Sequence, residues 1–320
     1  HMVVIPVYIP HLKGYYSDSF EILKECLESL KTTVQKKTFI SVVNNGSCEE
    51  VRNYLDSLYQ DQFISEVIHT TNIGKVNAIL KGISGHSDVL ITISDADILF
   101  KKGWQEETLR IFNTFPKAGV VGLIPQFKMF TSYSSNLIFD NFLNKDLKFT
   151  NVLEPEAMKL FYKSIGWNDN YNEEYLKMHL TISKKNVTSV VGSGHAVATY
   201  RSEIFTKIKH ESTNYKLGGN SENKILDESI LKLDGWRLTT ERNFAYHMGN
   251  TFEDWMNDIL EPDFKDSSEE LSEMVAPELN IDHIAYFFKY KLFKKFLKWE
   301  CVNKFFLKWK GLTQTSINTY

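Results

Sequence analysis

The chain has 320 residues, of which 42% are hydrophobic and 24% are charged, proportions that are ordinary for a folded protein and unlike those of a disordered one. At roughly 150 residues per domain, this length predicts about two domains. The net charge of −3 argues against a general nucleic-acid binder, and three scattered cysteines argue against a disulfide framework or a zinc site. We find no secretory signal and no uncharged apolar run of the ~18 residues that span a bilayer, so we expect a cytoplasmic protein.

Short apolar runs alternate with helix-like stretches in the first half of the chain. The predicted elements are a strand at 3–8, a helix at 17–34, a strand at 39–43, a helix around 51–58, a strand at 67–68, a helix at 76–83 and a strand at 88–94. The last strand is almost entirely apolar, which is typical of the buried centre of a parallel sheet. This order predicts an α/β layer fold with its ligand site at the carboxyl ends of the strands.

The second half is less regular. The predicted elements are a strand at 119–124, a mixed segment without clear periodicity at 126–187, a strand at 190–200, a helix at 225–233 and a short strand at 243–246. An acid-rich connector occupies 253–282, in which Ser267 and Glu270 form a possible capping box.

Two carboxylates, Asp95 and Asp97, come directly after the apolar strand at 88–94. At the end of a strand, side chains spaced by two residues can both reach a divalent cation, and hard oxygen ligands suit Mg²⁺ or Mn²⁺. The same pattern also occurs in solvated turns. The buried strand before it favours metal binding, because it brings both acids to the edge where such sheets bind ligands.

Six segments stand out in chain order: V-V-I-P-V-Y, N-N-G-S, N-I-G-K-V-N-A-I-L-K-G-I, S-D-A-D-I-L-F, G-S-G-H-A-V-A-T-Y-R-S-E-I-F and L-D-E-S-I-L-K-L-D-G-W-R-L. Together they resemble successive landmarks of family 2 glycosyltransferases, over roughly residues 2–250. The resemblance implies the GT-A fold, a Rossmann-like α/β architecture with a mixed sheet flanked by helices. It also implies a donor-binding half at about 2–125 and an acceptor half at about 126–250. Beyond the resemblance, the composition of residues 251–320 predicts an acidic connector and basic amphipathic C-terminal helices.

The resemblance implies a donor site at the strand ends. Its residues would be Pro6, Val7, Tyr8, Asn44, Asn45, Asn72, Gly74, Lys75, Asn77, Asp95, Ala96 and His195. In this set Asn44 or Asn45 stands where the family commonly has an Asp that reads the uracil edge. For Pro6 and Gly74, turn geometry alone is an alternative explanation, and His195 could equally be a packed loop residue.

The resemblance also implies a metal site and a base. Asp97 and His247, with Asp95, would bind Mn²⁺ or Mg²⁺, and the acidic pair Asp227-Glu228 would contain the base that deprotonates the acceptor hydroxyl. In the family the second acid of the pair is usually the base, which indicates Glu228. The distance to Gly235 is shorter than usual, so the register could instead indicate Asp227, and both remain candidates.

The function implied is a metal-dependent inverting glycosyltransferase of the hexosyltransferase type. It would move a sugar from a nucleotide-diphosphate sugar onto a glycan acceptor such as a lipid-linked surface polysaccharide or lipooligosaccharide precursor. A UDP-sugar is the favoured donor. One alternative is a nucleotidyltransferase of similar fold, although I-P-H-L-K-G-Y-Y is a poor match to its glycine-rich loop. The other is a non-catalytic sugar-nucleotide-binding protein, against which the intact acidic and histidine positions argue.

Residues 284–312 form a basic tail. Eight lysines and one acid, Glu300, give this segment a charge of +7, which leaves −10 on the rest of the chain. Aromatic residues recur there at helical spacing: Phe288, Phe296, Trp299, Phe306 and Trp309. Such a helix is typical of the surface of an anionic membrane, here the inner face of the cytoplasmic membrane. Packing against the catalytic domain is the main alternative, and single-stranded nucleic acid is a weaker one.

Overall fold

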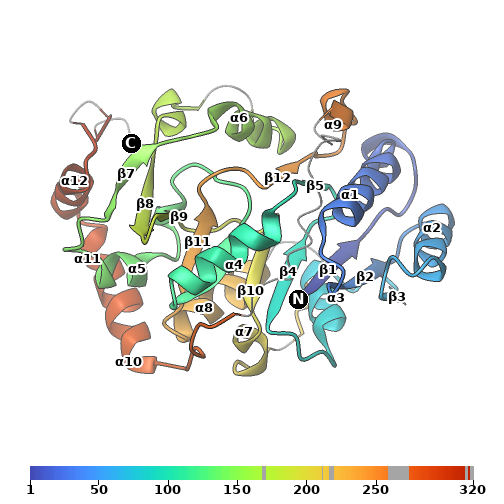
Figure 1. Cartoon of the computed structure of the whole chain (residues 1–320), viewed down its shortest axis with the longest axis horizontal. Helices are drawn as coiled ribbons and strands as arrows, with labels where there is room; N and C mark the ends of the chain where they lie inside the picture. Colours follow the sequence, from blue (N-terminus) through green and yellow to red (C-terminus); the bar gives the residue numbers. More distant parts are fainter. Residues whose placement is uncertain (168–170, 211, 216–219, 259–273, 314–315, 318–320) are drawn as a thin grey trace.

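The computed structural model describes residues 1–167, 171–210, 212–215, 220–258, 274–313 and 316–317. Across these residues runs a ten-stranded mixed sheet of order β3-β2-β1-β4-β10-β6-β11-β9-β8-β7 (Figure 1). Its strands are β1 (Met2–Val7), β2 (Phe39–Asn45), β3 (Glu66–Thr70), β4 (Leu90–Ser94), β6 (Ala118–Gly122), β7 (Leu147–Asn151), β8 (Met178–Lys184), β9 (Val187–Val191), β10 (Val197–Arg201) and β11 (Trp236–Thr240). A separate two-stranded sheet pairs β5 (Ile98–Phe100) with β12 (Ala245–His247).

The first half of the chain builds the parallel part of the sheet. Strands β3, β2, β1 and β4 are parallel and alternate along the chain with α1 (Ser19–Thr33), α2 (Glu49–Gln60) and α3 (Lys75–Ile83). Their apolar residues are buried because helices cover the sheet; β4 is buried along its whole length. The predicted α/β architecture is confirmed here, with small shifts at the element boundaries.

The second half turns the sheet into a mixed one. β10 runs antiparallel between β4 and β6, β11 is parallel to β6, and β9, β8 and β7 add antiparallel strands beyond β11. The helices of this half are α4 (Trp104–Thr114), α5 (Ser135–Asp140), α6 (Pro155–Ser164), α7 (Glu203–Thr206), α8 (Glu228–Lys232) and α9 (Trp255–Asp258). A π-helical turn, η4 (Asn223–Asp227), leads into α8. Three short 3₁₀ helices are η1 (Gly14–Tyr16), η2 (Met129–Thr131) and η3 (Glu173–Leu176).

The prediction of one strand at 190–200 is wrong. The chain forms β9 and β10 with a loop at 192–196 between them. Gly192 has a φ of +110°, and a Cβ there would lie 2.5 Å from the Cβ and 2.6 Å from the carbonyl carbon of Met129. Because only glycine tolerates this conformation and this contact, the strand ends at Gly192. The loop then presents His195 beside the end of β4.

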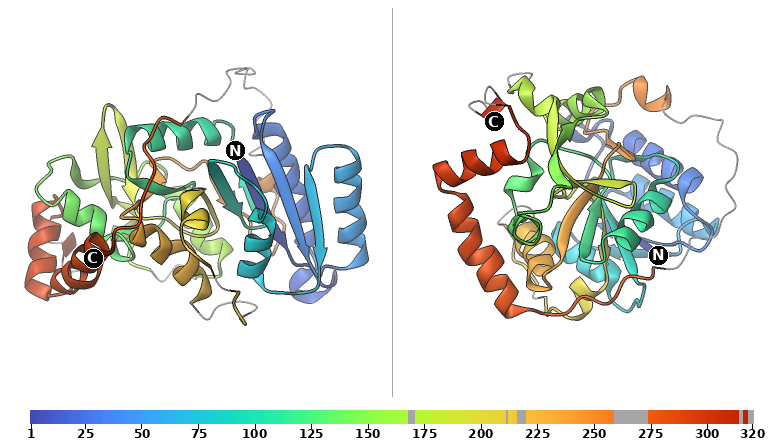
Figure 2. Two further views of the ribbon diagram at one scale, coloured as in Figure 1. Left: turned by 90° about the horizontal axis from the view of Figure 1, so that it is seen from below. Right: turned by 60° about the vertical axis from the view of Figure 1, so that its left-hand side comes forward.

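The basic tail is helical, as predicted, but its helices do not form one continuous stretch. The tail consists of α10 (His283–Ala285), the π-helical η5 (Tyr286–Leu292), α11 (Phe293–Leu297) and α12 (Glu300–Trp309), and Trp299 interrupts it with an extended backbone at φ −67° and ψ 128°. These helices lie at the end of the molecule away from α1 and α2 (Figure 2). Ser267 and Glu270, the expected capping box, lie outside the described residues. Among the helices that the structure describes, none is both long and apolar enough to cross a membrane.

Candidate active site

The D-A-D segment lies at the carboxyl end of β4, where the sheet changes from parallel to mixed. The Asp95 N–H donates a hydrogen bond to the Ala196 carbonyl (2.7 Å), and the Met248 N–H donates one to the Asp97 carbonyl (2.8 Å). Backbone bonds to two distant segments therefore fix this turn. Its carboxylates lie at the edge where α/β sheets bind ligands.

His247 joins the two acids because of a strand pair that the sequence did not reveal. β5 begins one residue after Asp97, and its antiparallel pairing with β12 sets His247 opposite Ile98. Asp95, Asp97 and His247 each offer one ligand atom, and these atoms lie within 4.8 Å of one another. Two carboxylates and an imidazole form a donor set that suits Mn²⁺ or Mg²⁺.

The orientation of the His247 ring is set by Ser164 at the end of α6. The Ser164 hydroxyl donates to the Phe161 carbonyl (2.7 Å), so its oxygen is left to accept from Nδ1 of His247 at 2.8 Å. Nε2 lies 3.4 Å from the Asp97 Oδ2. In the neutral imidazole with its proton on Nδ1, Nε2 offers a lone pair towards this carboxylate, and a cation bound by both groups would satisfy them.

Asp97 itself fits a metal ligand. Its Oδ1 is buried and has no hydrogen-bond partner among the described residues. Burial raises the pKa of Asp97, His247 in its protonated form opposes this rise, and the neighbouring Asp95 adds to it. The Asp97 side chain as a whole is half-buried, but a carboxylate oxygen that is buried without a partner is costly unless a cation or a proton neutralises it.

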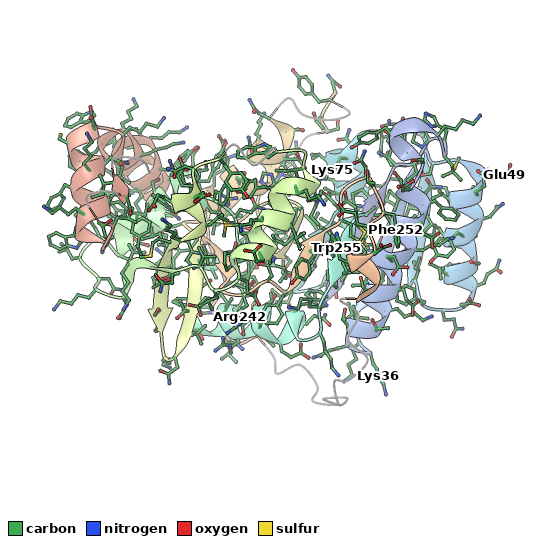
Figure 3. The ribbon with its side chains drawn as sticks, turned by 90° about the horizontal axis from the view of Figure 1, so that it is seen from above. Lys36, Glu49, Lys75, Arg242, Phe252 and Trp255 are labelled. Atoms are coloured by element: carbon green, nitrogen blue, oxygen red, sulfur yellow. The ribbon has the colours of Figure 1, made fainter. Side chains whose placement is uncertain are left out.

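Lys75 places a positive charge beside the acids. It is the first residue of α3, and its Nζ lies 2.6 Å from a carboxylate oxygen of Asp95 and 2.9 Å from one of Glu222. Burial lowers the pKa of Lys75, but the Asp95 and Glu222 carboxylates outweigh burial and raise it. The ammonium is therefore charged and held beside the D-A-D turn. Lys75 is labelled in Figure 3.

Two of the expected donor residues hold the loops behind this edge. The side-chain Nδ2 of Asn44 lies 3.0 Å from Nδ1 of His69, and its Oδ1 accepts the Ser47 N–H at 2.9 Å. The side-chain oxygen of Asn45 accepts the Ile73 N–H at 2.9 Å. Both asparagines are buried at the end of β2. Their side-chain bonds join β2 to the loops that come after β2 and β3.

The other expected donor residues surround the same edge. Pro6 and Val7 end β1, and Tyr8, just beyond the strand, is 40% exposed. Asn72 accepts the Gly74 N–H at 3.1 Å, and Gly74 precedes α3 with a φ of +89°. Asn77, in contrast, donates to the carbonyls of Ile73 and Thr213 and accepts the Thr213 N–H, so its amide joins two backbone segments.

Asp227, at the end of η4, and His195, in the loop between β9 and β10, form a second polar cluster. The Asp227 Oδ2 lies 2.8 Å from Nε2 of His195, and its Oδ1 lies 2.7 Å from Nη2 of Arg237. Asp227 is 2% exposed and Arg237 is 3% exposed. Arg237 also donates to the carbonyls of Ser132 and Ser193, so it connects Asp227 to the loop that carries His195.

Glu228, the other member of the acidic pair, has a different environment. It is half-buried at the start of α8. Burial, and after it the Glu228 carboxylate, raise the pKa of Tyr290 in the basic tail. Asp227 also contributes to this rise, so the two acids differ in their bonds: Asp227 bonds to His195.

The comparisons with known proteins identify the family. The model of "Glycosyl transferase family 2" matches residues 3–165, which is half of the chain. The chain belongs to glycosyl transferase family 2. No curated protein sequence gives a significant match. Family membership and the mixed sheet flanked by helices agree with the expected GT-A fold.

Several solved structures are similar to this family 2 chain at low sequence identity. TarS residues 1–349 from S. aureus is 11% identical, with a TM-score of 0.45, and the match covers 77% of this chain and 60% of that one. The mannosyltransferase PcManGT from Pyrobaculum calidifontis, in complex with GDP-Man and Mn²⁺, is 13% identical, with a TM-score of 0.41 and coverage of 75% and 53%. The matched part therefore spans less than two thirds of each of these chains.

In this family 2 chain the predicted site residues gather into two clusters. Asp95, Asp97 and His247 come together as one, and His195 and Asp227 as the other. The remaining expected donor residues lie at the strand ends around the first cluster or form hydrogen bonds with the loops there. Sequence reasoning assigned no role to three residues that hold these clusters: Ser164, Glu222 and Arg237. Only Arg237 had a signal, the arginine of the G-W-R segment, since the other two reach the site through tertiary contacts alone.

Proposed function

We propose that this chain is a metal-dependent inverting glycosyltransferase that moves a hexose from a UDP-sugar to a glycan acceptor. The observation that supports it most is the cluster of Asp95, Asp97 and His247 at the end of β4 in a family 2 chain. Oxygen and imidazole ligands at the carboxyl edge of an α/β sheet suit a cation that binds the diphosphate of a sugar nucleotide.

In this proposal the metal is bound by Asp97, His247 and Asp95. When bound, it supplies positive charge to the departing diphosphate. Lys75 lies next to the same position and adds a fixed ammonium group. The donor nucleotide would occupy the edge formed by Pro6–Tyr8, Asn44, Asn45, Asn72, Gly74 and Ala96. Its diphosphate would lie next to Asp95 and the metal.

The acceptor side of the reaction requires a base. In a single displacement the acceptor oxygen forms the new glycosidic bond while the bond to the diphosphate breaks, and the hydroxyl proton passes to the protein. The acidic pair Asp227 and Glu228 is the candidate source of this function. Asp227 is the member bonded to the His195 loop, which adjoins the D-A-D turn through the Asp95–Ala196 hydrogen bond.

Calorimetric titration with UDP and Mn²⁺ tests the donor half of the proposal. We expect UDP to bind in Mn²⁺ and to bind at least tenfold more weakly in EDTA, and Asp97→Asn to remove this difference. Asp61→Asn is the matched control, because Asp61 is exposed in a turn after α2. Equal binding of UDP by the native protein in Mn²⁺ and in EDTA would contradict the metal role.

Release of UDP from a panel of UDP-hexoses, with p-nitrophenyl hexosides as acceptors, tests turnover. Formation of a glycosylated p-nitrophenyl product with inverted anomeric configuration would support the proposal. Tight UDP binding without product from any pair would instead favour a non-catalytic sugar-nucleotide-binding protein. Retained configuration would refute the inverting mechanism.

We further propose that the acceptor is lipid-linked and that the basic tail brings the enzyme to an anionic membrane surface. One side of the tail packs on the protein: Tyr290, Phe306 and Leu307 are buried. The other side exposes a series of apolar residues spaced by three or four positions, each between 42% and 72% exposed: Ile284, Phe288, Leu292, Phe296 and Trp299. Exposed lysines alternate with them at 291, 295 and 298.

Both interpretations of the tail are therefore compatible with its structure. Packing fixes the helices, and the exposed aromatic and lysine side chains are of the kind that enter the interface of an anionic leaflet. Each lysine near such a surface contributes about 1 kcal/mol, whereas the rest of the chain, with its charge of −10, is repelled. The tail would then hold the active site close to a lipid-linked acceptor.

A further inference from the structure

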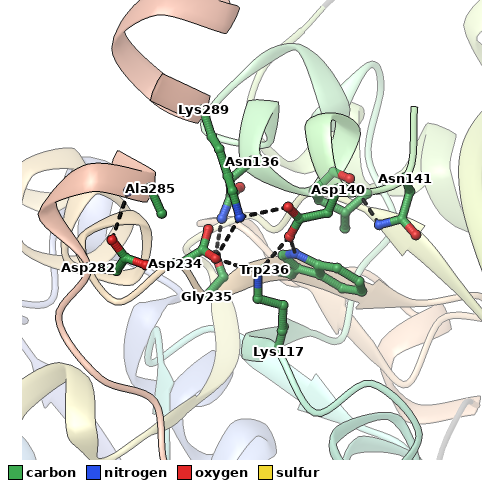
Figure 4. Close-up of polar contacts among 11 residues, drawn as sticks. Lys117, Asn136, Asp140, Asn141, Asp234, Gly235, Trp236, Asp282, Ala285 and Lys289 are labelled. Atoms are coloured by element: carbon green, nitrogen blue, oxygen red, sulfur yellow. Dashed lines mark hydrogen bonds and ion pairs between the residues drawn. The ribbon is translucent and has the colours of Figure 1, made fainter. Parts of the chain in front are cut away.

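The basic tail is attached to the helix that begins at the acidic pair. The Asp282 N–H donates to the carbonyl of Lys232, the last residue of α8, at 2.9 Å. Lys289 forms an ion pair of 2.7 Å with Asp234, two residues beyond that helix (Figure 4). η5 and α8 are in contact, and Glu228 is the first residue of α8. The tail therefore packs against the element that positions a candidate base.

Two tyrosines connect the tail to Asp227. The rings of Tyr290, on η5, and Tyr133, in the loop before α5, stack with centroids 6.0 Å apart and an interplanar angle of 16°. The Arg237 guanidinium carbon lies 5.6 Å from the centroid of the Tyr133 ring, and Arg237 forms the 2.7 Å ion pair with Asp227. Tyr133 has a φ of +52°, a left-handed conformation that is rare outside glycine and gathers at functional sites. These contacts hold the tail beside the acidic pair.

Lys294 adds a positive charge to this arrangement. Its Nζ donates to the Tyr290 hydroxyl at 3.0 Å, and it lies 4.3 Å from the centroid of the Tyr290 ring and 5.3 Å from that of Tyr133. Because an ammonium group only donates, the Tyr290 hydroxyl accepts here and keeps its own proton to donate. Lys294 is half-buried, and no carboxylate forms an ion pair with it among the described residues. Such an ammonium group gains from an anion that neutralises it.

Two further lysines increase the positive charge around Lys294. Burial lowers the pKa of Lys294, the charges of Lys298 and Lys291 lower it further, and the Glu228 carboxylate opposes them. Neither Lys291 nor Lys298 forms an ion pair with a carboxylate in the described part of the chain. The three ammonium groups therefore create a positive potential next to the acidic pair, and a bound anion would relieve their mutual repulsion.

We infer that Lys294, in the positive field of Lys291 and Lys298, binds a phosphate group of the acceptor beside the acidic pair. This inference rests on the proposed function and names the chemistry of its acceptor, a sugar whose reacting hydroxyl faces the acidic pair and whose phosphate contacts the tail. Lysine is a common phosphate ligand, which it binds as a point charge. In a lipid-linked acceptor whose sugar and lipid are joined through phosphate, one side of the tail would contact the membrane and the other side the acceptor.

The test compares two acceptors that share one hexose. One is a p-nitrophenyl hexoside, and the other is the hexosyl p-nitrophenyl phosphate, which has a phosphodiester between the sugar and the p-nitrophenyl group. With saturating UDP-hexose and Mn²⁺, we expect the native enzyme to have a KM at least tenfold lower for the phosphate acceptor. Lys294→Met should remove this preference and leave both kcat and the KM for the neutral hexoside within threefold of the native values. Lys294→Arg should keep most of the preference, because it keeps the charge.

Lys308→Met is the matched control. Lys308 is exposed on α12, and its replacement removes the same charge from the tail. It should keep the native preference for the phosphate acceptor. Loss of the preference in both variants would assign it to the overall charge of the tail and overturn the inference. A native enzyme that treats the two acceptors alike, or a Lys294→Met enzyme with the native preference, would also overturn the inference and leave the proposed function intact.

Vesicle sedimentation distinguishes an acceptor phosphate from a lipid headgroup. We expect Lys294→Met to sediment with phosphatidylserine vesicles like the native protein. Loss of sedimentation with an unchanged acceptor preference would assign Lys294 to the headgroup and overturn the inference.

Calorimetric titration of the UDP- and Mn²⁺-saturated protein with the hexosyl p-nitrophenyl phosphate separates failure of the inference from failure of the proposed function. We expect binding to be at least tenfold weaker in Lys294→Met than in the native protein. If this difference is found but the native protein forms no product, the proposed transfer is refuted and the phosphate site stands. If the difference is absent, the phosphate site is refuted whatever the turnover.

Discussion

The imidazole of His247 lies 3.4 Å from the Asp97 carboxylate although 149 residues separate them in the chain. The link between them is the pairing of β5 with β12, two strands of three residues each. Because this small sheet lies directly after the D-A-D turn, its register decides whether the histidine meets the acids. A shift of one residue would turn His247 to the other face.

Replacing Ser164 should weaken metal binding without changing the fold. Ser164 accepts from Nδ1 of His247 and so leaves Nε2 directed at Asp97. Loss of such an outer contact typically reduces metal affinity by about 10- to 100-fold. We therefore expect Ser164→Ala to raise the Mn²⁺ concentration needed for half-maximal UDP binding by at least tenfold, as measured by calorimetry.

Ser57→Ala is the matched control for this change. Ser57, like Ser164, lies in the last turn of a helix and donates to the carbonyl three residues before it at 2.7 Å, but it is on α2, away from the metal cluster. It should leave the Mn²⁺ requirement unchanged. An unaltered Mn²⁺ requirement in Ser164→Ala would remove His247 from the ligand set.

The sequence predicted the two acids of the D-A-D turn better than the residues that gather around them. Asp95 and Asp97 could be found because the largely apolar segment at 88–94 is a strong local signal of a buried strand, and the residues just after such a strand lie at the sheet edge. His247 came from a family resemblance, since the short strand predicted at 243–246 carries no signal of its pairing with β5. The Asp227–His195 contact depends on the turn at Gly192, where a positive φ replaced the continuous strand that the apolar run indicated.

His179 should make the protein less stable in mild acid. It is 3% exposed on β8, and neither ring nitrogen has a hydrogen-bond partner among the described residues. Burial lowers the pKa of His179 to about 4, against about 6.5 for an unfolded histidine. The unfolded chain therefore binds a proton first, so stability from this group is intact above pH ~6.5 and falls as the pH drops towards about 4.

Urea unfolding at two pH values measures this effect. At pH 5 we expect the native protein to have lost about 2 kcal/mol of unfolding free energy to His179, relative to pH 7.5. His179→Leu removes the titrating group and the unpaired ring nitrogens, so its loss between these pH values should be smaller by that amount. An identical pH dependence in both proteins would mean that His179 is solvated or paired in the native state.

Lys289 anchors the basic tail to the catalytic domain. Its Nζ lies 2.7 Å from carboxylate oxygens of both Asp140 and Asp234, which also bind Lys117 (Figure 4). Burial opposes the charge, but the two carboxylates raise the pKa of Lys289 to about 12. We expect Lys289→Met to lower the unfolding free energy by about 2 kcal/mol, because two charge-assisted hydrogen bonds are lost and the acids keep only Lys117.

Lys295→Met is the control for Lys289→Met. Lys295 is exposed on the neighbouring α11, and its replacement removes the same charge from the tail. It should change the unfolding free energy by less than about 0.5 kcal/mol. If both substitutions have the same small effect in urea unfolding, the cluster of Figure 4 does not hold the tail in solution.

The exposed side of the tail should bind anionic membranes independently of its packing. Deleting the tail is a poor test, because Phe306, Leu307 and Leu312 belong to the core and their loss would unfold their surroundings. Phe288 and Trp299 are 54% and 63% exposed, so replacing both with serine removes apolar contact area without opening the core. We expect this double variant to keep its unfolding free energy and to lose sedimentation with phosphatidylserine vesicles.

The control variant replaces Tyr59 and Trp167, which are 53% and 54% exposed and lie outside the tail, with serine. It should sediment with the vesicles like the native protein. Lysines at 291, 295 and 298 contribute through charge, so native binding should also weaken as salt rises from about 0.05 to about 0.5 M. Over this range the electrostatic screening length falls from above to below about 10 Å. Vesicle binding that survives both the Phe288 and Trp299 substitutions and high salt would show that another surface meets the membrane. Absence of native binding at low salt would leave the tail with packing as its only role.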